Sequence, residues 1–315
     1  MKARNPEMRI FSGSASRSLA EKIVGYLGVS LGSSETYHFS DGNTFVRINE
    51  TVRGDDIYLI QTIGRKPNDE FMELLFWVDA FKRASANSVT AIMPFFGYAK
   101  GDKKDEPRVS IRARVCADAL EAAGVDRAVA MDLHSPQIQG FFHVPVDHLY
   151  AMTELCRPIQ VTAGNTVVVS PDVGFAKRAR AYAEFLGAAV AIGDKMRLDH
   201  RERAEVLEII GDVEGREALI VDDFTISGVT LAEIAAALAR KGARRIRACV
   251  SHCLLDGQGL SVIEDSPIEE LIVTDTVDNE ALETCPKIKI VTVAGLLGEA
   301  LRRIHCRDSV SALFE

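Results

Sequence analysis

The chain is organised around one stretch, Ala218–Leu231, with the sequence ALIVDDFTISGVTL. Its apolar start runs into two adjacent carboxylates, Asp222 and Asp223, and then into a short segment rich in small and hydroxyl residues. An apolar-periodic segment follows. This order predicts a buried strand over 218–223, a tight loop and a helix over 230–240.

The loop of this stretch has the composition of a binding site for a phosphorylated sugar. Ligands of open α/β sheets bind where the parallel strands end. Backbone N–H groups at a helix start attract an anion, and Ser227 and Thr230 add hydroxyl donors. The two aspartates cannot bind that anion, but they suit sugar hydroxyls or a magnesium ion. The pattern therefore predicts a ribose-phosphate site. The plainer interpretation is a capped helix that follows two solvated aspartates.

The rest of the chain repeats the alternation of strand and helix. In the first half we expect strands over 8–12, 36–43, 56–61 and 89–93, and helices over 14–27 and 68–84. In the second half we expect further strands over 166–170, 188–192 and 245–251, and a helix over 174–186. This rhythm predicts an α/β protein with two similar domains, 1–150 and 151–295, each a mainly parallel sheet flanked by helices.

The composition is that of a soluble globular protein. The chain has 315 residues, of which 47% are hydrophobic and 26% charged, and its net charge is −8. A general nucleic-acid binder needs a basic face, so this charge argues against one. No apolar run reaches membrane-spanning length, and the start, MKARNPEMRI, lacks the apolar core of a signal peptide. We expect a cytoplasmic protein without nucleic-acid or membrane partners.

The six cysteines are scattered, and no C-x-x-C pair occurs. Cys249, His252 and Cys253 lie close together, but on a strand they do not all point to one face, which disfavours a zinc site. We therefore expect buried, reduced thiols.

Several polar residues lie where further strands end. His134 follows a strand-like segment, and a lone histidine there is more often structural than catalytic. Asp172 lies at a strand-to-helix turn, where it can cap the helix or bind a ligand. Lys195 and Arg197 are two residues apart near a strand end, so they point the same way and can converge on one phosphate chain. The plainer interpretation of this pair is a basic rim.

The segment 99–114 breaks the rhythm because it is almost entirely charged. Most such segments are solvated loops. The functional alternative is a mobile arm that lays cations over a polyphosphate.

Five motifs together give the chain a family resemblance. VDDFTISGVT at 221–230 resembles the PRPP-binding loop of the type I phosphoribosyl family. Motifs of ribose-phosphate pyrophosphokinases, the PRPP synthetases, resemble FSDGN at 39–43, DLHSPQIQGFF at 132–142, SPDVG at 170–174 and DKMR at 194–197. The similarity covers nearly the whole chain.

The resemblance implies transfer of the diphosphate of ATP to the 1-hydroxyl of ribose 5-phosphate, which gives PRPP and AMP and uses Mg²⁺. It makes 1–150 the nucleotide side, with 296–315 packed on it, and 151–295 the ribose-phosphate side. By resemblance, the ATP-binding residues are Phe39, Asp41, Asn43, Lys100, Gly101, Asp102 and His134. The ribose 5-phosphate-binding residues are Asp222, Asp223, Thr225, Ile226, Ser227, Gly228, Val229 and Thr230. The implied magnesium ligands are His134 and Asp172, and the implied catalytic residues are Lys195 and Arg197.

Several positions depart from the family's usual residues. The loop that often reads R-Q-D in the family reads K-G-D at 100–102. Lys100 therefore has no planar guanidinium, and Gly101 has no side chain. Asn43 replaces a glutamate. Ile226 replaces an acidic residue of the PRPP loop, and Val229 replaces its second glycine. A β-branched residue at that glycine position is expected to restrict the backbone.

Two other functions compete with this one. A catalytically impaired regulatory subunit of PRPP-synthetase type would account for Ile226 and Val229, but the implied catalytic and metal-binding residues are all present. A phosphoribosyltransferase would share the PRPP loop, but transferases of that loop type do not carry the nucleotide motifs.

By resemblance we also expect a homo-oligomer built from dimers, up to a hexamer. The segment FMELLFWV at 71–78 supports this expectation weakly, since Phe76 and Trp77 exceed what one helix face can bury. Ser309 and Ser311 lie in a tail that resembles the family's phosphate/ADP regulatory segment at a subunit interface. The plainer interpretation of the tail is a C-terminal strand that packs on the first domain.

Overall fold

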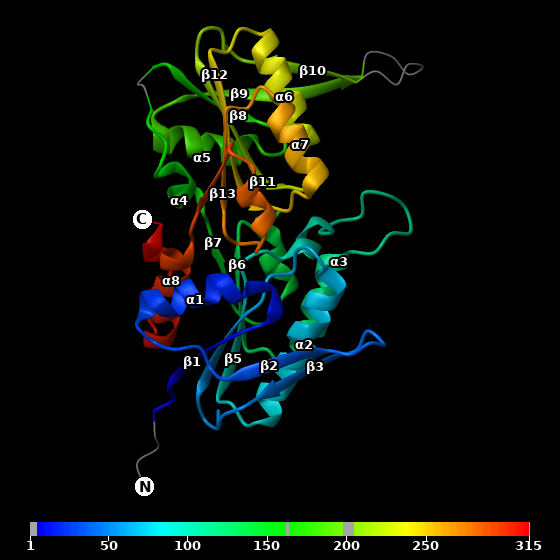
Figure 1. The fold of residues 1–315 in the computed structure, drawn as a ribbon, viewed down its shortest axis with the longest axis vertical. Helices are drawn as coiled ribbons and strands as arrows, with labels where there is room; N and C mark the ends of the chain where they lie inside the picture. The colour runs from blue at the N-terminus through cyan, green and yellow to red at the C-terminus, as the bar shows by residue number, and fades with distance from the viewer. Residues whose placement is uncertain (1–4, 162–163, 198–204, 315) are drawn as a thin grey trace. The chain divides into compact units, whose positions relative to one another are not determined.

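The computed structural model describes residues 5–161, 164–197 and 205–314 (Figure 1). Its strands are β1 (Met8–Ser12), β2 (Ser34–His38), β3 (Thr44–Ile48), β4 (Asp56–Ile60), β5 (Ser88–Met93), β6 (Arg127–Met131), β7 (Val146–Leu149), β8 (Thr166–Ser170), β9 (Ala189–Arg197), β10 (Glu205–Ile210), β11 (Glu217–Thr225), β12 (Arg245–Cys253), β13 (Glu270–Thr274) and β14 (Ile288–Val291). Its helices are α1 (Arg17–Leu27), α2 (Pro67–Arg83), α3 (Arg112–Ala123), α4 (Met152–Cys156), α5 (Ala176–Leu186), α6 (Val229–Arg240), α7 (Gly257–Asp265) and α8 (Ala294–Cys306).

The chain divides into two compact units, each with its own sheet. Unit 1 consists of 1–150, 276–278 and 292–315, and unit 2 consists of 151–275 and 279–291. The C-terminal helix α8 therefore belongs to unit 1, where it packs against α1. The predicted α/β fold with two mainly parallel sheets is confirmed.

The sheet of unit 1 is parallel throughout, in the order β1-β4-β5-β6-β7. Helices α2 and α3 cover one face, and α1 and α8 lie on the other (Figure 1). The antiparallel hairpin β2–β3 packs against α2. Parallel strands need crossover connections, and helices covering both faces account for the continuous apolar runs of the strands.

The sheet of unit 2 has the order β10-β9-β8-β11-β12-β13-β14. Only the edge pair β9–β10 is antiparallel among the described strands of this sheet. Strand β11 lies between β8 and β12, and α6 and α7 pack together on one face. The strand is longer than the predicted 218–223, so both aspartates lie within its last residues.

The core of unit 1 corrects one expectation about its surface. Trp77 is fully buried, and its ring stacks on Phe81 with centroids 5.6 Å apart. Only Phe76 of the pair remains partly exposed, at 38%. The α2 helix buries Trp77 because unit 1 packs a sheet under the helix and the β2–β3 hairpin beside it, a neighbour that helical periodicity alone does not reveal.

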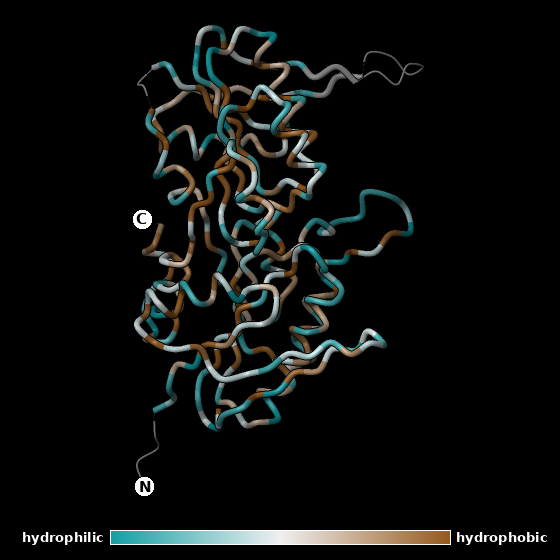
Figure 2. Tube along the Cα trace, in the orientation of Figure 1, coloured by the Kyte–Doolittle hydropathy of each residue, from teal (hydrophilic) through white to brown (hydrophobic). Residues whose placement is uncertain are grey.

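Hydrophobic residues lie along the central strands of each unit, whereas the loop at 101–111 is largely hydrophilic (Figure 2). Five cysteines are buried as predicted, but Cys306 at the end of α8 is exposed. Within the described residues, no helix combines the length and the apolar character that crossing a membrane requires.

Candidate active site

The loop between β11 and α6 owes its shape to one glycine. Gly228 has a φ of +73°, in the left-handed region that favours glycine. A Cβ atom there would also lie 3.2 Å from the carbonyl oxygen of Gly259 in α7. Val229 is the first residue of α6 and does not have a positive φ. Gly228 therefore supplies the turn, and Val229 has a helical conformation that a β-branched residue can adopt.

The start of α6 presents both donors and apolar side chains. Ser227 and Thr230 are exposed beside its first N–H groups, and no side chain caps the helix. The Val229 N–H donates a long hydrogen bond of 3.5 Å to Ser227 Oγ. Ile226 is also exposed, so it takes no part in the core. The first N–H groups of a helix have no partners within the helix, so this exposed helix start is suited to an anion.

Three carboxylates come together beside this loop. Burial raises the pKa of Asp222 well above its ordinary value, and the charges of Asp223 and, to a smaller degree, Asp172 raise it further. Asp223 is buried, with Arg178 Nη1 3.8 Å from its Oδ2. The strand ends of β8 and β11 therefore concentrate negative charge where cations or hydroxyl donors would relieve it.

The carboxylates suit a magnesium ion that arrives with substrate phosphates. Among the described residues, no cluster of three or more His, Cys, Asp or Glu side chains could hold a metal on its own. Mg²⁺ is usually bound by one or two carboxylates together with phosphates and water. Asp222 and Asp172 offer such oxygens, although Asp172 also accepts a hydrogen bond of 2.8 Å from the Phe175 N–H as a cap before α5.

Lys195 and Arg197 lie in the last residues of β9, where Lys195 pairs with Leu207 of β10 in register. Strand β9 runs to Arg197, well past the predicted end at 192. The two side chains fall outside the described part of the chain, so their convergence on a phosphate chain stays a prediction.

In unit 1 the hairpin turn after β2 carries the candidate adenine site. Phe39 is 56% exposed and meets Phe45 in an edge-to-face contact, with ring centroids 6.3 Å apart. Asn43 donates to Asp41 through both its backbone N–H and its side-chain amide, each at 3.0 Å. These bonds lower the pKa of Asp41. A glutamate at 43 could not donate the side-chain bond, so Asn43 fixes the turn in its own way.

Sequence reasoning missed the buried carboxylate that holds this hairpin. Glu73 of α2 is 1% exposed and accepts hydrogen bonds from the Ser14 N–H and Thr36 Oγ1 at 2.9 Å, and from Trp77 Nε1 at 3.3 Å. Thr36 lies in β2, so Glu73 ties the hairpin to α2. The available signal was a glutamate within the apolar face of an amphipathic helix.

In the loop after β5, the side chain of Arg112 occupies the space beside Gly101. A Cβ atom at Gly101 would lie 2.5 Å from Nε of Arg112 and 2.9 Å from its Cβ. Arg112 starts α3, is exposed, and forms no ion pair with a described residue. The Nζ of Lys100 lies 5.6 Å from the Phe95 ring centroid. Oδ1 of Asp102 is buried and has no hydrogen-bond partner among the described residues.

The remaining candidates are distributed over both units. His134 is exposed just after β6 in unit 1, whereas Asp172 belongs to unit 2, so a joint metal site stays a prediction. Ser309 and Ser311 are exposed in unit 1. Their tail is not the strand of the plainer interpretation. It ends in a short 3-10 turn, and Phe314 packs edge-to-face on Tyr150 at 5.7 Å between centroids.

Comparisons with known proteins agree with this arrangement. Residues 8–124 match a family model described as the N-terminal domain of ribose phosphate pyrophosphokinase, and residues 200–315 match a phosphoribosyl synthetase-associated domain. The chain is 46% identical to the ribose-phosphate pyrophosphokinase of Thermotoga maritima, with 98% of each chain covered. It belongs to the ribose-phosphate pyrophosphokinase family.

Further relatives support this assignment along the whole chain. The ribose-phosphate pyrophosphokinase of Clostridium acetobutylicum is 44% identical over 98% of this chain and 97% of its own. The crystal structure of phosphoribosylpyrophosphate synthetase from Mycobacterium smegmatis superposes with a TM-score of 0.89 at 34% identity, and covers 96% of this chain and 99% of that one. A ribose-phosphate pyrophosphokinase is an enzyme, and the fold of this chain is the family's fold.

Proposed function

We propose that this chain transfers the β,γ-diphosphoryl group of ATP to the 1-hydroxyl of ribose 5-phosphate and forms PRPP and AMP. The observation that carries the proposal is the exposed start of α6 beside the carboxylates at the end of β11, in a chain related over 98% of its length to a ribose-phosphate pyrophosphokinase. Nothing favours a regulatory subunit, and a phosphoribosyltransferase would leave the family match over 8–124 unexplained.

The residues take complementary roles in this proposal. The N–H groups of α6, with Ser227 and Thr230, bind the 5-phosphate, while Asp222 and Asp223 orient the ribose hydroxyls. Lys195 and Arg197 offset the charge that develops on the transferred group. Asp172 and His134 are the side chains that would bind Mg²⁺ in this proposal, each together with substrate phosphates, and the ion would supply charge neutralisation. The test is AMP release from ATP, which should require both ribose 5-phosphate and Mg²⁺.

The nucleotide side belongs to unit 1 in this proposal. The exposed ring of Phe39 stacks on adenine, and Asp41 and Asn43 contact the nucleotide. Lys100, Gly101 and Asp102 contribute to the same site from the loop after β5. We place the domain boundary at 150/151, with the C-terminal segment 296–315 on the nucleotide domain.

Changing Ile226 to aspartate is expected to alter turnover by less than about tenfold. A carboxylate there adds one hydroxyl contact, worth about 0.5–1.5 kcal/mol, beside a phosphate that it repels. Ile226 is exposed, so the change leaves the core intact. Steady-state AMP release measures the effect. A gain of several orders of magnitude would identify the natural chain as an impaired paralogue.

Arg112 is expected to supply the planar guanidinium that the K-G-D loop lacks. Because it fills the space at Gly101, its guanidinium lies at the base of the loop without an ion-pair partner among the described residues. Arg112→Ala should raise the KM for ATP about tenfold, the scale of one charge-assisted hydrogen bond, and leave the KM for ribose 5-phosphate unchanged. Arg83→Ala, which removes an exposed arginine of α2, is the matched control. Equal effects of both changes would contradict the role.

The protein is proposed to be a cytoplasmic homo-oligomer built from dimers, up to a hexamer. The partly exposed Phe76 and Met72 of α2 are apolar groups that a second copy could cover. We expect light scattering to give a mass that is a multiple of the 34.4 kDa chain at micromolar concentration. A monomer alone would refute the assembly.

A further inference from the structure

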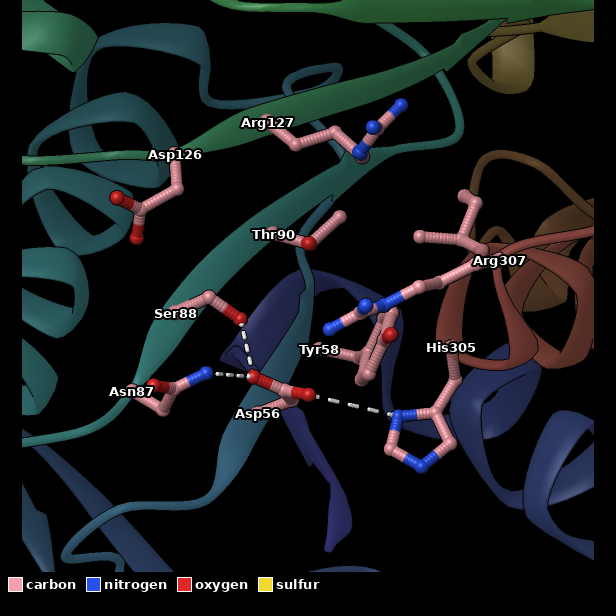
Figure 3. A pocket seen from close by; sticks show the side chains of 10 residues that line it. Asp56, Tyr58, Asn87, Ser88, Thr90, Asp126, Arg127, His305 and Arg307 are labelled. Carbon is pink, nitrogen blue, oxygen red and sulfur yellow. Dashed lines mark hydrogen bonds and ion pairs between the residues drawn. The ribbon is translucent and has the colours of Figure 1, made fainter. Parts of the chain in front are cut away.

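A polar pocket lies at the amino edge of the sheet of unit 1 (Figure 3). Its volume is about 400 Å³, and it is lined by the first residues of β4, β5 and β6 and by the end of α8. Lys100 and His134, the candidate ATP residues, follow the opposite ends of β5 and β6. The pocket is therefore separate from the nucleotide site proposed for this unit.

A row of polar residues crosses the sheet at the base of the pocket. The strand register pairs Tyr58 with Thr90, and Thr90 with Arg127. Tyr58 is 3% and Thr90 4% exposed, and neither hydroxyl has a hydrogen-bond partner among the described residues. Burial raises the pKa of Tyr58, and the charge of Asp56 raises it further, so its hydroxyl stays a donor. An unpaired hydroxyl at the base of an open pocket can bond to water or to a ligand there.

Most charges around the pocket are already compensated. Asp56 accepts bonds from Asn87 Nδ2 at 2.7 Å and from Ser88 Oγ at 2.6 Å. Its Oδ2 lies 3.6 Å from Nδ1 of His305, a buried atom with no hydrogen-bond partner among the described residues. Asp126 is paired with Lys82, and Arg127 with Asp147.

Arg307 is the exception among the charged residues of the pocket. It forms no ion pair or side-chain hydrogen bond with a described residue, and its guanidinium extends from the end of α8 towards Tyr58 (Figure 3). Its φ of +63° is the left-handed conformation that ends α8 and that glycine usually adopts. The carbonyl end of a helix offsets only roughly half an elementary charge, so positive charge remains over the pocket.

We propose that this pocket binds a small oxyanion, the carboxylate or phosphate group of a metabolite. The planar guanidinium of Arg307 pairs with two oxygens of such a group, and the hydroxyls of Tyr58 and Thr90 donate to it. A bound anion would join the end of α8 to strands β4 and β5. The site belongs to one unit and does not depend on the proposed reaction.

The test is isothermal titration of the full-length protein with inorganic phosphate and, separately, with citrate, at constant ionic strength. Arg307→Gly removes the guanidinium but suits the left-handed backbone, so it should not impair folding. Tyr58→Phe removes a single hydroxyl. Arg302→Ala, on the exposed side of α8, is the matched control. Phosphate can also bind at the start of α6, so the difference between wild type and Arg307→Gly is the deciding quantity.

We expect Arg307→Gly to remove one class of binding sites, Tyr58→Phe to weaken that class severalfold, and Arg302→Ala to leave it unchanged. Loss of phosphate binding identifies a phosphate group as the ligand, and loss of citrate binding alone identifies a carboxylate. Identical isotherms for wild type and Arg307→Gly with both anions would overturn the proposal.

Discussion

Replacing Lys195 by alanine is expected to lower the rate of AMP release about a hundredfold or more. A cation aimed at charge that develops in the transition state contributes on the scale of 10²–10³ in turnover. Its loss should reduce kcat while the KM values for ATP and ribose 5-phosphate change little, because the interaction strengthens only as the diphosphoryl group moves. Steady-state kinetics with both substrates varied measures this split.

The matched control for Lys195→Ala is Lys177→Ala, because Lys177 is an exposed lysine of α5 in the same unit. It should leave kcat within a factor of two, in line with the small effect of most exposed charges. A loss of only a few-fold in Lys195→Ala would remove Lys195 from the catalytic group and leave Arg197 as the principal cation of β9.

Asp222→Asn is expected to weaken ribose 5-phosphate binding about 10- to 100-fold and yet to stabilise the ligand-free protein at neutral pH. The binding loss follows from charge-assisted hydrogen bonds to sugar hydroxyls, each worth about 1.5–3 kcal/mol. The stability gain follows from the raised pKa of Asp222, which burial and Asp223 cause. An amide at 222 removes the charge that these neighbours oppose.

The sign of the pH dependence follows from proton linkage. A carboxyl whose pKa is higher in the folded state binds more protons when folded, so it costs nothing below its unfolded pKa of about 3.9. Its penalty grows as the pH rises above that value towards the raised folded pKa. The melting temperature of Asp222→Asn should therefore exceed that of wild type at pH 7 and converge with it towards pH 4. A variant less stable at pH 7 would contradict the strained carboxylate pair.

The periodicity of the chain was enough to predict the fold, because each strand and helix carries its own apolar pattern. Strand ends were less predictable. The register of β11 with β12 continues through Asp222 to Thr225, and such neighbour-strand pairing leaves no local signal. The site loop was predictable for the same reason as the fold, since Ser227, Gly228 and Thr230 have to follow a buried strand to act together.

Tertiary packing accounts for what the sequence left open. Trp77 is buried by neighbours distant in sequence, and Glu73 is buried with it as the acceptor for the β2–β3 hairpin. The side chain of Arg112, eleven positions along the chain, occupies the space that a side chain at Gly101 would need. The αL conformation falls on Gly228 rather than at Val229, a distinction of one residue that the motif alone could not decide.

Phosphorus NMR of a single reaction mixture tests whether this chain transfers the diphosphoryl group of ATP. With ATP, ribose 5-phosphate and Mg²⁺, we expect AMP and PRPP in equal amounts and no ADP. Arg83→Ala should behave as wild type in the same mixture. Formation of ADP, or ATP consumption without a diphosphate on carbon 1 of the sugar, would contradict diphosphoryl transfer by this chain.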